Sequence, residues 1–241
     1  MEPGDQRSSQ DFTRTRWSMV QRLRGPNPGA ARAALAELAV RYWYPVYAYV
    51  RRCGHAPEIA QDITRAFLQQ VATETRDGTA VPRGRFRGWL LLRLGTFLAG
   101  DWRELVDGEP LVAALAPDDV EPRTRGDLAA AGSPGQAFQR SFALEVLARG
   151  FKTLQAEARQ TGHMDMYEAL EPYLSRDLLP GQYEEIGRRL GVRPLALVLA
   201  LKRLRQRFRE LVQQELADTV ASPEELDAEQ HDLLASLHVS T

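Results

Sequence analysis

The 241-residue sequence contains a single cysteine and has no long apolar run. One cysteine excludes an internal disulfide and a cysteine-based metal cluster, and it favours a reducing compartment. No stretch approaches the roughly 20 apolar residues that a membrane-spanning helix requires, and the polar N-terminus lacks the apolar centre of a signal peptide. The sequence therefore predicts a cytoplasmic protein that does not contact a membrane.

Signatures of enzymes are also missing. We find no glycine-rich phosphate loop, nucleophile elbow or pair of catalytic carboxylates. The spacing of His55, Glu58 and Asp62 suits metal ligands on one helix face, but His55 precedes the helix and no second ligand group accompanies them. We therefore expect no enzymatic activity, no metal or other cofactor and no small-molecule substrate.

Charge is strongly separated along the chain, although the formal net charge is only −1. Residues 188–209 include eight basic side chains and no acidic one, whereas residues 215–232 include seven acidic side chains. A basic segment of this kind is compatible with nucleic-acid binding even in a nearly neutral protein. The acidic segment leaves three possibilities open: an amphipathic helix that folds back on the basic segment, a partner-binding helix or a solvated tail.

Apolar residues recur every three or four positions through most of the chain, so the sequence predicts an all-α fold. Predicted helices cover residues 16–24, 30–51, 57–71, 85–102, 137–161, 163–174, 183–190 and 194–212, with a polar loop over 73–82. Glycine, proline and aspartate without periodicity indicate a flexible linker before the fifth of these helices. The predicted organisation is a disordered leader (1–11), a helical domain (12–105), the linker (106–136), a second helical domain (137–214) and an acidic tail (215–241).

The second predicted domain contains a helix-turn-helix pattern. A short helix over 183–190 is followed by the tight turn of Gly191, Val192 and Arg193, and then by a longer basic helix that begins at Pro194. In this motif the second helix enters the major groove of DNA, where arginine side chains bind phosphates and base edges. The pattern therefore predicts a DNA-binding domain.

Six segments of the chain, taken in order, resemble the extracytoplasmic-function sigma factors, especially a branch found in large genomes. These segments are TRWS (15–18), RYWYPVYAYVRR (41–52), GRFRGWLL (84–91), YEEI (183–186), LGV (190–192) and RLRQRFRE (203–210). The resemblance spans most of the chain, although each segment alone is only moderately specific. It implies a two-domain transcription initiation factor whose partners are core RNA polymerase and promoter DNA.

The resemblance also implies roles for individual residues. The first domain would dock on the polymerase clamp and melt the −10 promoter element, and the second would read the −35 element. The implied polymerase-binding residues are Glu58, Gln61, Asp62, Thr64 and Arg65. The implied DNA-binding residues are Arg85, Phe86, Arg87 and Trp89 in the first domain, and Arg193, Lys202, Arg203, Arg205 and Arg207 in the second. The spacing of Phe86 and Trp89 fits core packing as well as contact with unpaired bases.

The predicted docking helix departs from the family pattern. Only Glu58 and Asp62 remain acidic over 58–67, so its attraction to a basic clamp is expected to be weak. In one branch of the family a serine/threonine kinase phosphorylates a threonine on this helix, and Thr64 matches that position. A phosphothreonine adds about −1.5 to −2 charges, which would restore the missing acidity. One hypothesis is therefore a gate at Thr64, and the alternative is a plain solvent-facing threonine.

Two further departures concern DNA contact. The first half of the basic helix, residues 194–201, is almost wholly apolar, where a reading helix presents polar side chains. Residues 100–109 are neutral to acidic, where family members often continue with a basic segment. The alternative function is therefore a degenerate sigma-like regulatory interaction protein that no longer initiates transcription.

Overall fold

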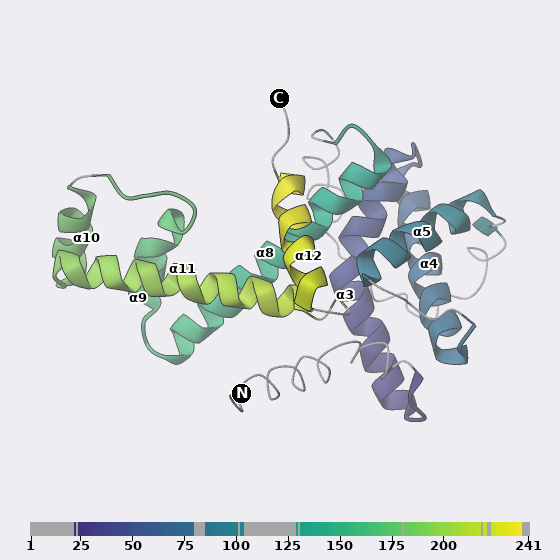
Figure 1. Cartoon of the computed structure of the whole chain (residues 1–241), viewed down its shortest axis with the longest axis horizontal. Helices are drawn as coiled ribbons and strands as arrows, with labels where there is room; N and C mark the ends of the chain where they lie inside the picture. The colour runs from purple at the N-terminus through teal and green to yellow at the C-terminus, as the bar shows by residue number, and fades with distance from the viewer. Residues whose placement is uncertain are drawn as a thin grey trace. The chain divides into compact units, whose positions relative to one another are not determined.

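The computed structural model describes residues 22, 24–79, 85–100, 102–103, 129, 131–179, 181–217, 219–220 and 223–237. Within them every regular element is a helix, which confirms the predicted all-α fold (Figure 1). The elements are α3 (Pro28–Arg52), α4 (Pro57–Asp77), α5 (Phe86–Ala99), α8 (Pro134–Gln160), α9 (Met164–Leu170), the 3-10 helix η2 (Glu171–Tyr173), α10 (Gln182–Leu190), α11 (Pro194–Ala217) and α12 (Pro223–Leu237). None of the described helices combines the length and the apolar character needed to cross a bilayer. The predicted leader (1–11), most of the predicted helix over 16–24 and most of the predicted linker (106–136) lie outside the described residues.

Local chemistry explains where the first helices begin and end. The Asn27 side chain accepts hydrogen bonds from the N–H groups of Gly29 and Ala30 at 2.9 and 3.2 Å, which caps α3. At the end of α4, Gly78 adopts a left-handed conformation with φ of 74°, which a glycine accepts without steric cost. The polar loop predicted over 73–82 is wrong for residues 73–77, which continue α4. Thr75 is buried there and holds the last turn of the helix against the core.

The chain divides into two compact units. Unit 1 comprises Met1–Glu145 together with Leu216–Thr241, and unit 2 comprises Val146–Glu215. The division lies within α8, whereas the sequence placed the start of the second domain at residue 137. From Leu216 onward, the segment expected to be an acidic tail belongs to unit 1.

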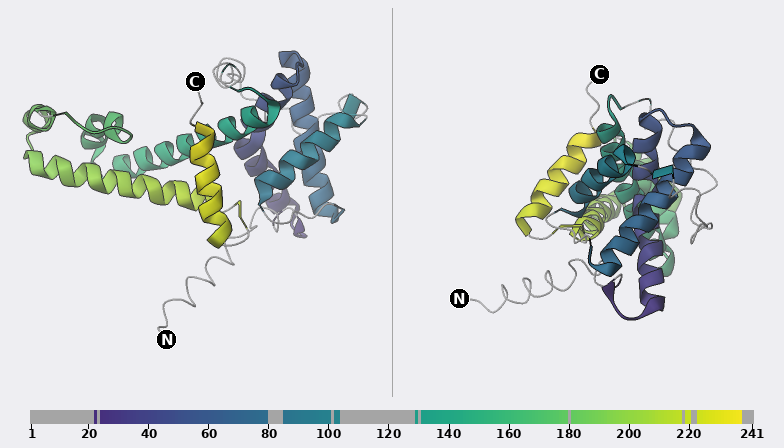
Figure 2. Two further views of the ribbon diagram at one scale, coloured as in Figure 1. Left: turned by 45° about the horizontal axis from the view of Figure 1, so that its top comes forward. Right: turned by 90° about the vertical axis from the view of Figure 1, so that its right-hand side faces the viewer.

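Unit 1 is built around an aromatic core. Helices α3 and α4 pack side by side, and α12 lies beside α8, where Arg140 donates a 3.2 Å hydrogen bond to the Leu237 carbonyl (Figure 2). The Tyr42 ring stacks on Phe142 at a centroid distance of 5.7 Å and contacts Phe86 at 5.3 Å. Burial of each large apolar side chain contributes about 1.5–3 kcal/mol, so this cluster is a major source of unit 1 stability.

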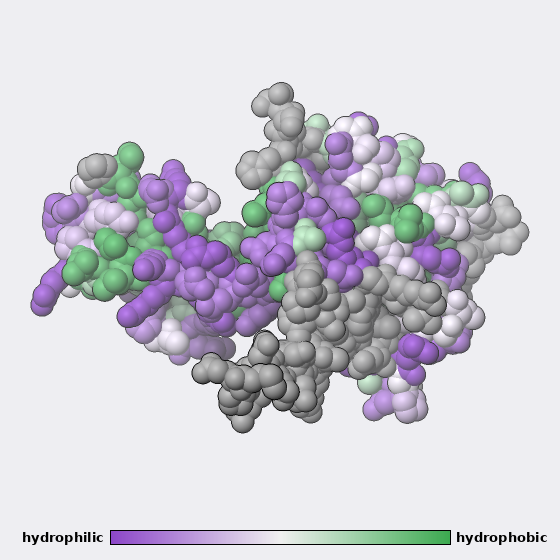
Figure 3. Space-filling model, viewed as in Figure 1, coloured by the Kyte–Doolittle hydropathy of each residue, from purple (hydrophilic) through white to green (hydrophobic). Residues whose placement is uncertain are grey.

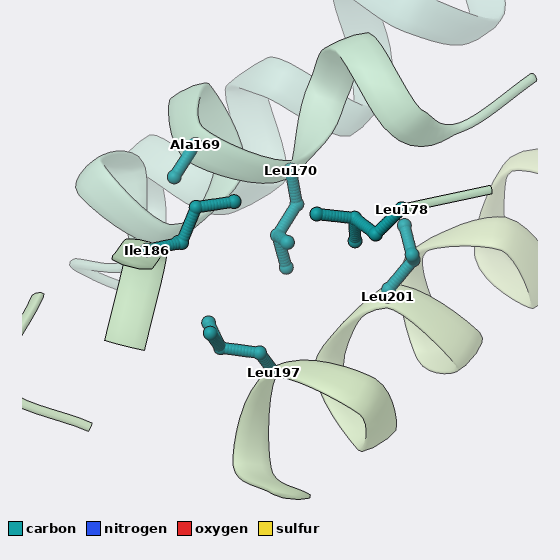
Figure 4. Close-up of a cluster of buried hydrophobic side chains, with 6 residues drawn as sticks. All are labelled: Ala169, Leu170, Leu178, Ile186, Leu197 and Leu201. Atoms are coloured by element: carbon teal, nitrogen blue, oxygen red, sulfur yellow. The ribbon is translucent and has the colours of Figure 1, made fainter. Parts of the chain in front are cut away.

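Unit 2 has its own core, which joins the end of α9, the loop after it, α10 and α11. The buried side chains point toward one another in Figure 4 and are those of Ala169, Leu170, Leu178, Ile186, Leu197 and Leu201. A neighbouring cluster joins α8 to α11 through Leu154, Ala158 and Leu211, with Tyr167 from α9. These contacts fix α10 against α11 and so position the predicted helix-turn-helix.

Candidate nucleic-acid interface

The turn between α10 and α11 has a backbone that requires glycine at two positions. Gly191 ends α10 in the left-handed region with φ of 67°, and the Val192 N–H donates a 2.9 Å hydrogen bond to the Gly187 carbonyl. A Cβ atom at Gly187 would lie 2.7 Å from the Val192 carbonyl oxygen, which is closer than real Cβ contacts. Gly187 therefore permits the close approach of the turn to α10, and the short helix, turn and long helix predicted from the sequence are confirmed.

Six basic side chains are exposed on this motif, and none forms an ion pair with a described residue. They are Arg188 and Arg189 at the end of α10, Arg193 in the turn, and Lys202, Arg203 and Arg209 on α11. Of the predicted DNA-binding residues in unit 2, Arg193, Lys202 and Arg203 therefore offer cationic groups to solvent. Unpaired and exposed cations are the groups that bind phosphates with little loss of internal contacts.

The two remaining predicted DNA contacts, Arg205 and Arg207, are engaged within unit 2. Arg205 donates to the Tyr173 carbonyl at 2.9 Å and pairs with Asp177 at 2.9 Å. Arg207 pairs with Glu157 at 2.6 Å, and its hydrogen bond lowers the pKa of that carboxyl group. These arginines tie α11 to the segment after α9 and to α8, so their first role is structural.

The apolar first half of α11 has two distinct faces. Leu197 and Leu201 are buried in the core, whereas Leu195, Val198 and Leu199 are 68%, 42% and 48% exposed. Figure 3 shows apolar surface among hydrophilic surface over α10 and α11. The face of α11 that a DNA-reading helix uses therefore begins with aliphatic side chains, which offer bases no hydrogen bonds.

The four predicted DNA contacts in unit 1 lie at the start of α5 in different environments. Phe86 is 2% exposed and packs on Tyr42, so the structure favours the core-packing interpretation of its spacing. Arg87 is also buried, while Trp89 and Arg85 are half-buried. In this conformation neither Phe86 nor Arg87 is accessible to DNA. The predicted neutral-to-acidic segment over 100–109 lies largely outside the described residues.

Carboxylates of α12 hold the two arginines at the start of α5. Arg87 donates two hydrogen bonds to Glu229, at 2.7 and 2.9 Å, and the Glu229 side chain is fully buried. Arg85 pairs with Asp232 and lies 3.2 Å from Glu229, and its hydrogen bond with Asp232 raises its pKa. The Phe86 N–H also donates a 2.9 Å hydrogen bond to the Thr219 carbonyl, just before α12. The sequence pattern leaves the place of the acidic segment open and does not connect it with Arg85 and Arg87.

The predicted polymerase-docking face of α4 is only weakly acidic. Glu58 is exposed, and Gln61, Asp62 and Arg65 are half-buried. Arg65 donates a 2.7 Å hydrogen bond to Asp62, so the second of the two acids is largely neutralised by its own helix. This supports the expectation of weak electrostatic attraction to a basic partner.

Thr64 does not lie on that surface. Its side chain is 0% exposed, and its hydroxyl donates a 2.7 Å hydrogen bond to the Ala60 carbonyl. Both the phosphorylation gate and the plain solvent-facing threonine require Thr64 to lie on the surface. Neither fits this burial, because Ala60, Thr64 and Leu68 form part of the buried face of α4. Phosphorylation at Thr64 stays a prediction, and a kinase would first require α4 to open.

The His55 side chain packs against an aromatic ring. It meets the Trp102 ring edge-on at a centroid distance of 5.5 Å. Among the residues that the structure describes, no group of three or more His, Cys, Asp or Glu side chains is arranged to hold a metal ion.

Comparison with protein-family models, with curated proteins and with solved structures finds no match to this chain.

Proposed function

We propose that the chain is a sigma-like transcription protein that binds DNA through α10 and α11 and binds core RNA polymerase through α4. The observation that carries the proposal is a helix-turn-helix with six exposed basic side chains and no acidic side chain from residue 186 to residue 209. Such a surface is attracted to the phosphate backbone, and the fixed turn orients α11 for entry into a groove.

The polymerase contact of the proposal rests on the exposed Glu58 and on the half-buried Gln61 and Asp62. Because Arg65 neutralises much of the Asp62 charge, this contact is expected to be weak and sensitive to salt. Thr64 lies outside this contact, because its hydroxyl is buried and donates a hydrogen bond to the Ala60 carbonyl.

Loss of the exposed basic side chains should weaken DNA binding in a salt-dependent way. We expect the triple substitution Arg193→Ala, Lys202→Ala and Arg203→Ala to reduce the slope of log affinity against log salt by about three, roughly one per lost phosphate contact. Fluorescence anisotropy with a labelled DNA duplex at several salt concentrations measures this slope.

The matched control is Arg159→Ala, which removes an exposed arginine of unit 2 at the end of α8. It should leave the slope unchanged. An equal loss in the control and in the triple variant would mean that binding depends on net charge alone, and the helix-turn-helix would not be the DNA site.

A second function is favoured by the exposed aliphatic side chains of α11. Leu195, Val198 and Leu199 fall on one side of the helix, and an apolar patch bordered by polar groups is typical of a protein interface. Under this alternative the chain keeps the sigma-like fold and regulates through a protein partner, with weak DNA contact.

One variant separates the two functions. The double substitution Leu195→Ser and Leu199→Ser leaves the buried Leu197 and Leu201 in place, so unit 2 should retain its stability. We expect DNA affinity to change less than threefold, because phosphate contacts dominate the binding. The protein-partner function would instead be supported if the wild type does not bind DNA, or if its DNA binding is unaffected by the loss of Arg193, Lys202 and Arg203.

A further inference from the structure

Helix α12 is tied to two arginines at the start of α5, Arg85 and Arg87. Two carboxylates of α12, those of Glu229 and Asp232, supply the ion pairs of both arginines. The pair between Arg87 and Glu229 has two parallel hydrogen bonds, the geometry in which a guanidinium also binds a phosphate. The site on α5 is thus suited to phosphate groups and is filled by the chain's own acidic helix.

The attachment of α12 is confined to one face of the helix. Glu229 and Leu233 are buried, whereas Asp227, Ala228 and His231 are exposed. A helix of 15 residues has marginal stability in water without packing against a partner, so α12 depends on this face. Loss of a small set of contacts should therefore release the whole helix.

We infer that α12 is an autoinhibitory helix whose carboxylates compete with nucleic-acid phosphates for Arg85 and Arg87. This rests on the proposed function, since it assigns to unit 1 a second DNA contact that is masked while α12 is docked. Release of α12 exposes the two guanidinium groups to solvent, and the phosphate backbone replaces the carboxylates. Phe86 stays in the core in both states, because its ring packs on Tyr42 from α3.

The test releases α12 in the full chain by two independent routes. The first is the double substitution Glu229→Gln and Asp232→Asn, which removes both charges and preserves side-chain shape. The second is Leu233→Ser, which weakens the apolar contact and leaves all four charged groups in place. The control is Asp227→Asn with Asp165→Asn, which removes two carboxylates at exposed positions.

Two readouts are measured on each variant: amide hydrogen exchange over residues 223–237, and anisotropy with a labelled DNA duplex. Both release variants should exchange faster over α12 and should bind DNA roughly tenfold more tightly or better, because two further phosphate contacts become available. Adding Arg85→Ala to the double substitution should remove about half of this gain on a logarithmic scale, because one of the two phosphate contacts is lost. The control should match the wild type in both readouts.

Faster exchange over α12 without tighter DNA binding would overturn the inference, as would unchanged exchange in both release variants. If both variants lose the helical content of unit 1 by circular dichroism, α12 is an inseparable part of that unit and the inference also fails. The proposed function is tested separately in the same assay, because it predicts wild-type binding that is lost with Arg193, Lys202 and Arg203 whatever the state of α12.

Discussion

Replacing Gly187 with alanine is expected to destabilise unit 2 and to disable its helix-turn-helix. The added Cβ would lie 2.7 Å from the Val192 carbonyl oxygen, and this atom belongs to the backbone of the turn, so no side-chain rotation relieves the overlap. Overpacking of this kind costs about 1–3 kcal/mol or more. Because the turn sets the angle between α10 and α11, DNA affinity should fall together with stability.

Gly88→Ala is the matched control for this prediction. Gly88 lies within α5, and a Cβ there meets no atom within 4 Å. Alanine in a helix interior is more favourable than glycine by about 0.5–1 kcal/mol, so this variant should be slightly more stable than the wild type.

Hydrogen exchange can assign the effect of Gly187→Ala to one unit. All four tryptophans of the chain lie outside Val146–Glu215, so their fluorescence during urea unfolding does not report on unit 2. Faster exchange of the amides of α10 and α11, with an unchanged fluorescence transition, is the expected pattern. Exchange rates equal to those of the wild type would show that the close approach of the turn is not required.

A charge mimic at Thr64 is expected to disrupt unit 1 rather than to activate the protein. Thr64→Glu would place a carboxylate at a fully buried position, where the hydroxyl of Thr64 donates a hydrogen bond to the Ala60 carbonyl and an ionised carboxylate has no proton to donate. An unpaired buried charge costs several kcal/mol, so α4 should lose much of its packing. The urea midpoint of unit 1, followed by tryptophan fluorescence, should fall accordingly.

The chain offers a close control for this substitution on the same helix. Thr73 is exposed on α4, so Thr73→Glu introduces the same charge and length into solvent. Exposed substitutions usually change stability by less than about 0.5 kcal/mol. If Thr64→Glu were as stable as Thr73→Glu, the described burial of Thr64 would be wrong and a phosphorylation gate on this helix would regain support.

Local patterns in the sequence were sufficient to predict the helix-turn-helix. The turn depends on Gly191 and on the residues next to it, and the basic helix that follows has a continuous period of three to four. Such features are encoded within a few residues of each other and do not depend on the rest of the fold. The start of this helix at Pro194 was predicted correctly, but its end was placed too early, because the last turns of α11 include the buried Leu216.

The buried face of α4 was only partly predictable. Ile63, Phe67 and Val71 are buried as expected, but Ile59 of the same predicted series is 43% exposed. The buried face of α4 is broader than the predicted one, because it also includes Ala60, Thr64 and Leu68. The spacing of these three residues was visible in the sequence, yet a threonine gives little hydrophobic signal, and its burial was decided by the packing of α4 on α3.

The contacts of α12 could not be derived from local patterns. Arg87 and Glu229 are separated by 142 positions in the chain, and other residues of the same charge lie close to each of them in the sequence. Periodicity identified an acidic segment with leucines, but the partner of that segment is decided by tertiary packing. The same holds for Arg205 and Arg207, which the sequence assigned to DNA and the structure pairs with Asp177 and Glu157.

Co-purification with bacterial core RNA polymerase shows whether the chain acts as a sigma-like transcription protein. The tagged wild-type chain should retain the polymerase at low salt, and Glu58→Lys with Asp62→Lys should lose it, because the docking face of α4 then repels a basic clamp. Failure of the wild type to retain polymerase at any salt concentration would contradict this role.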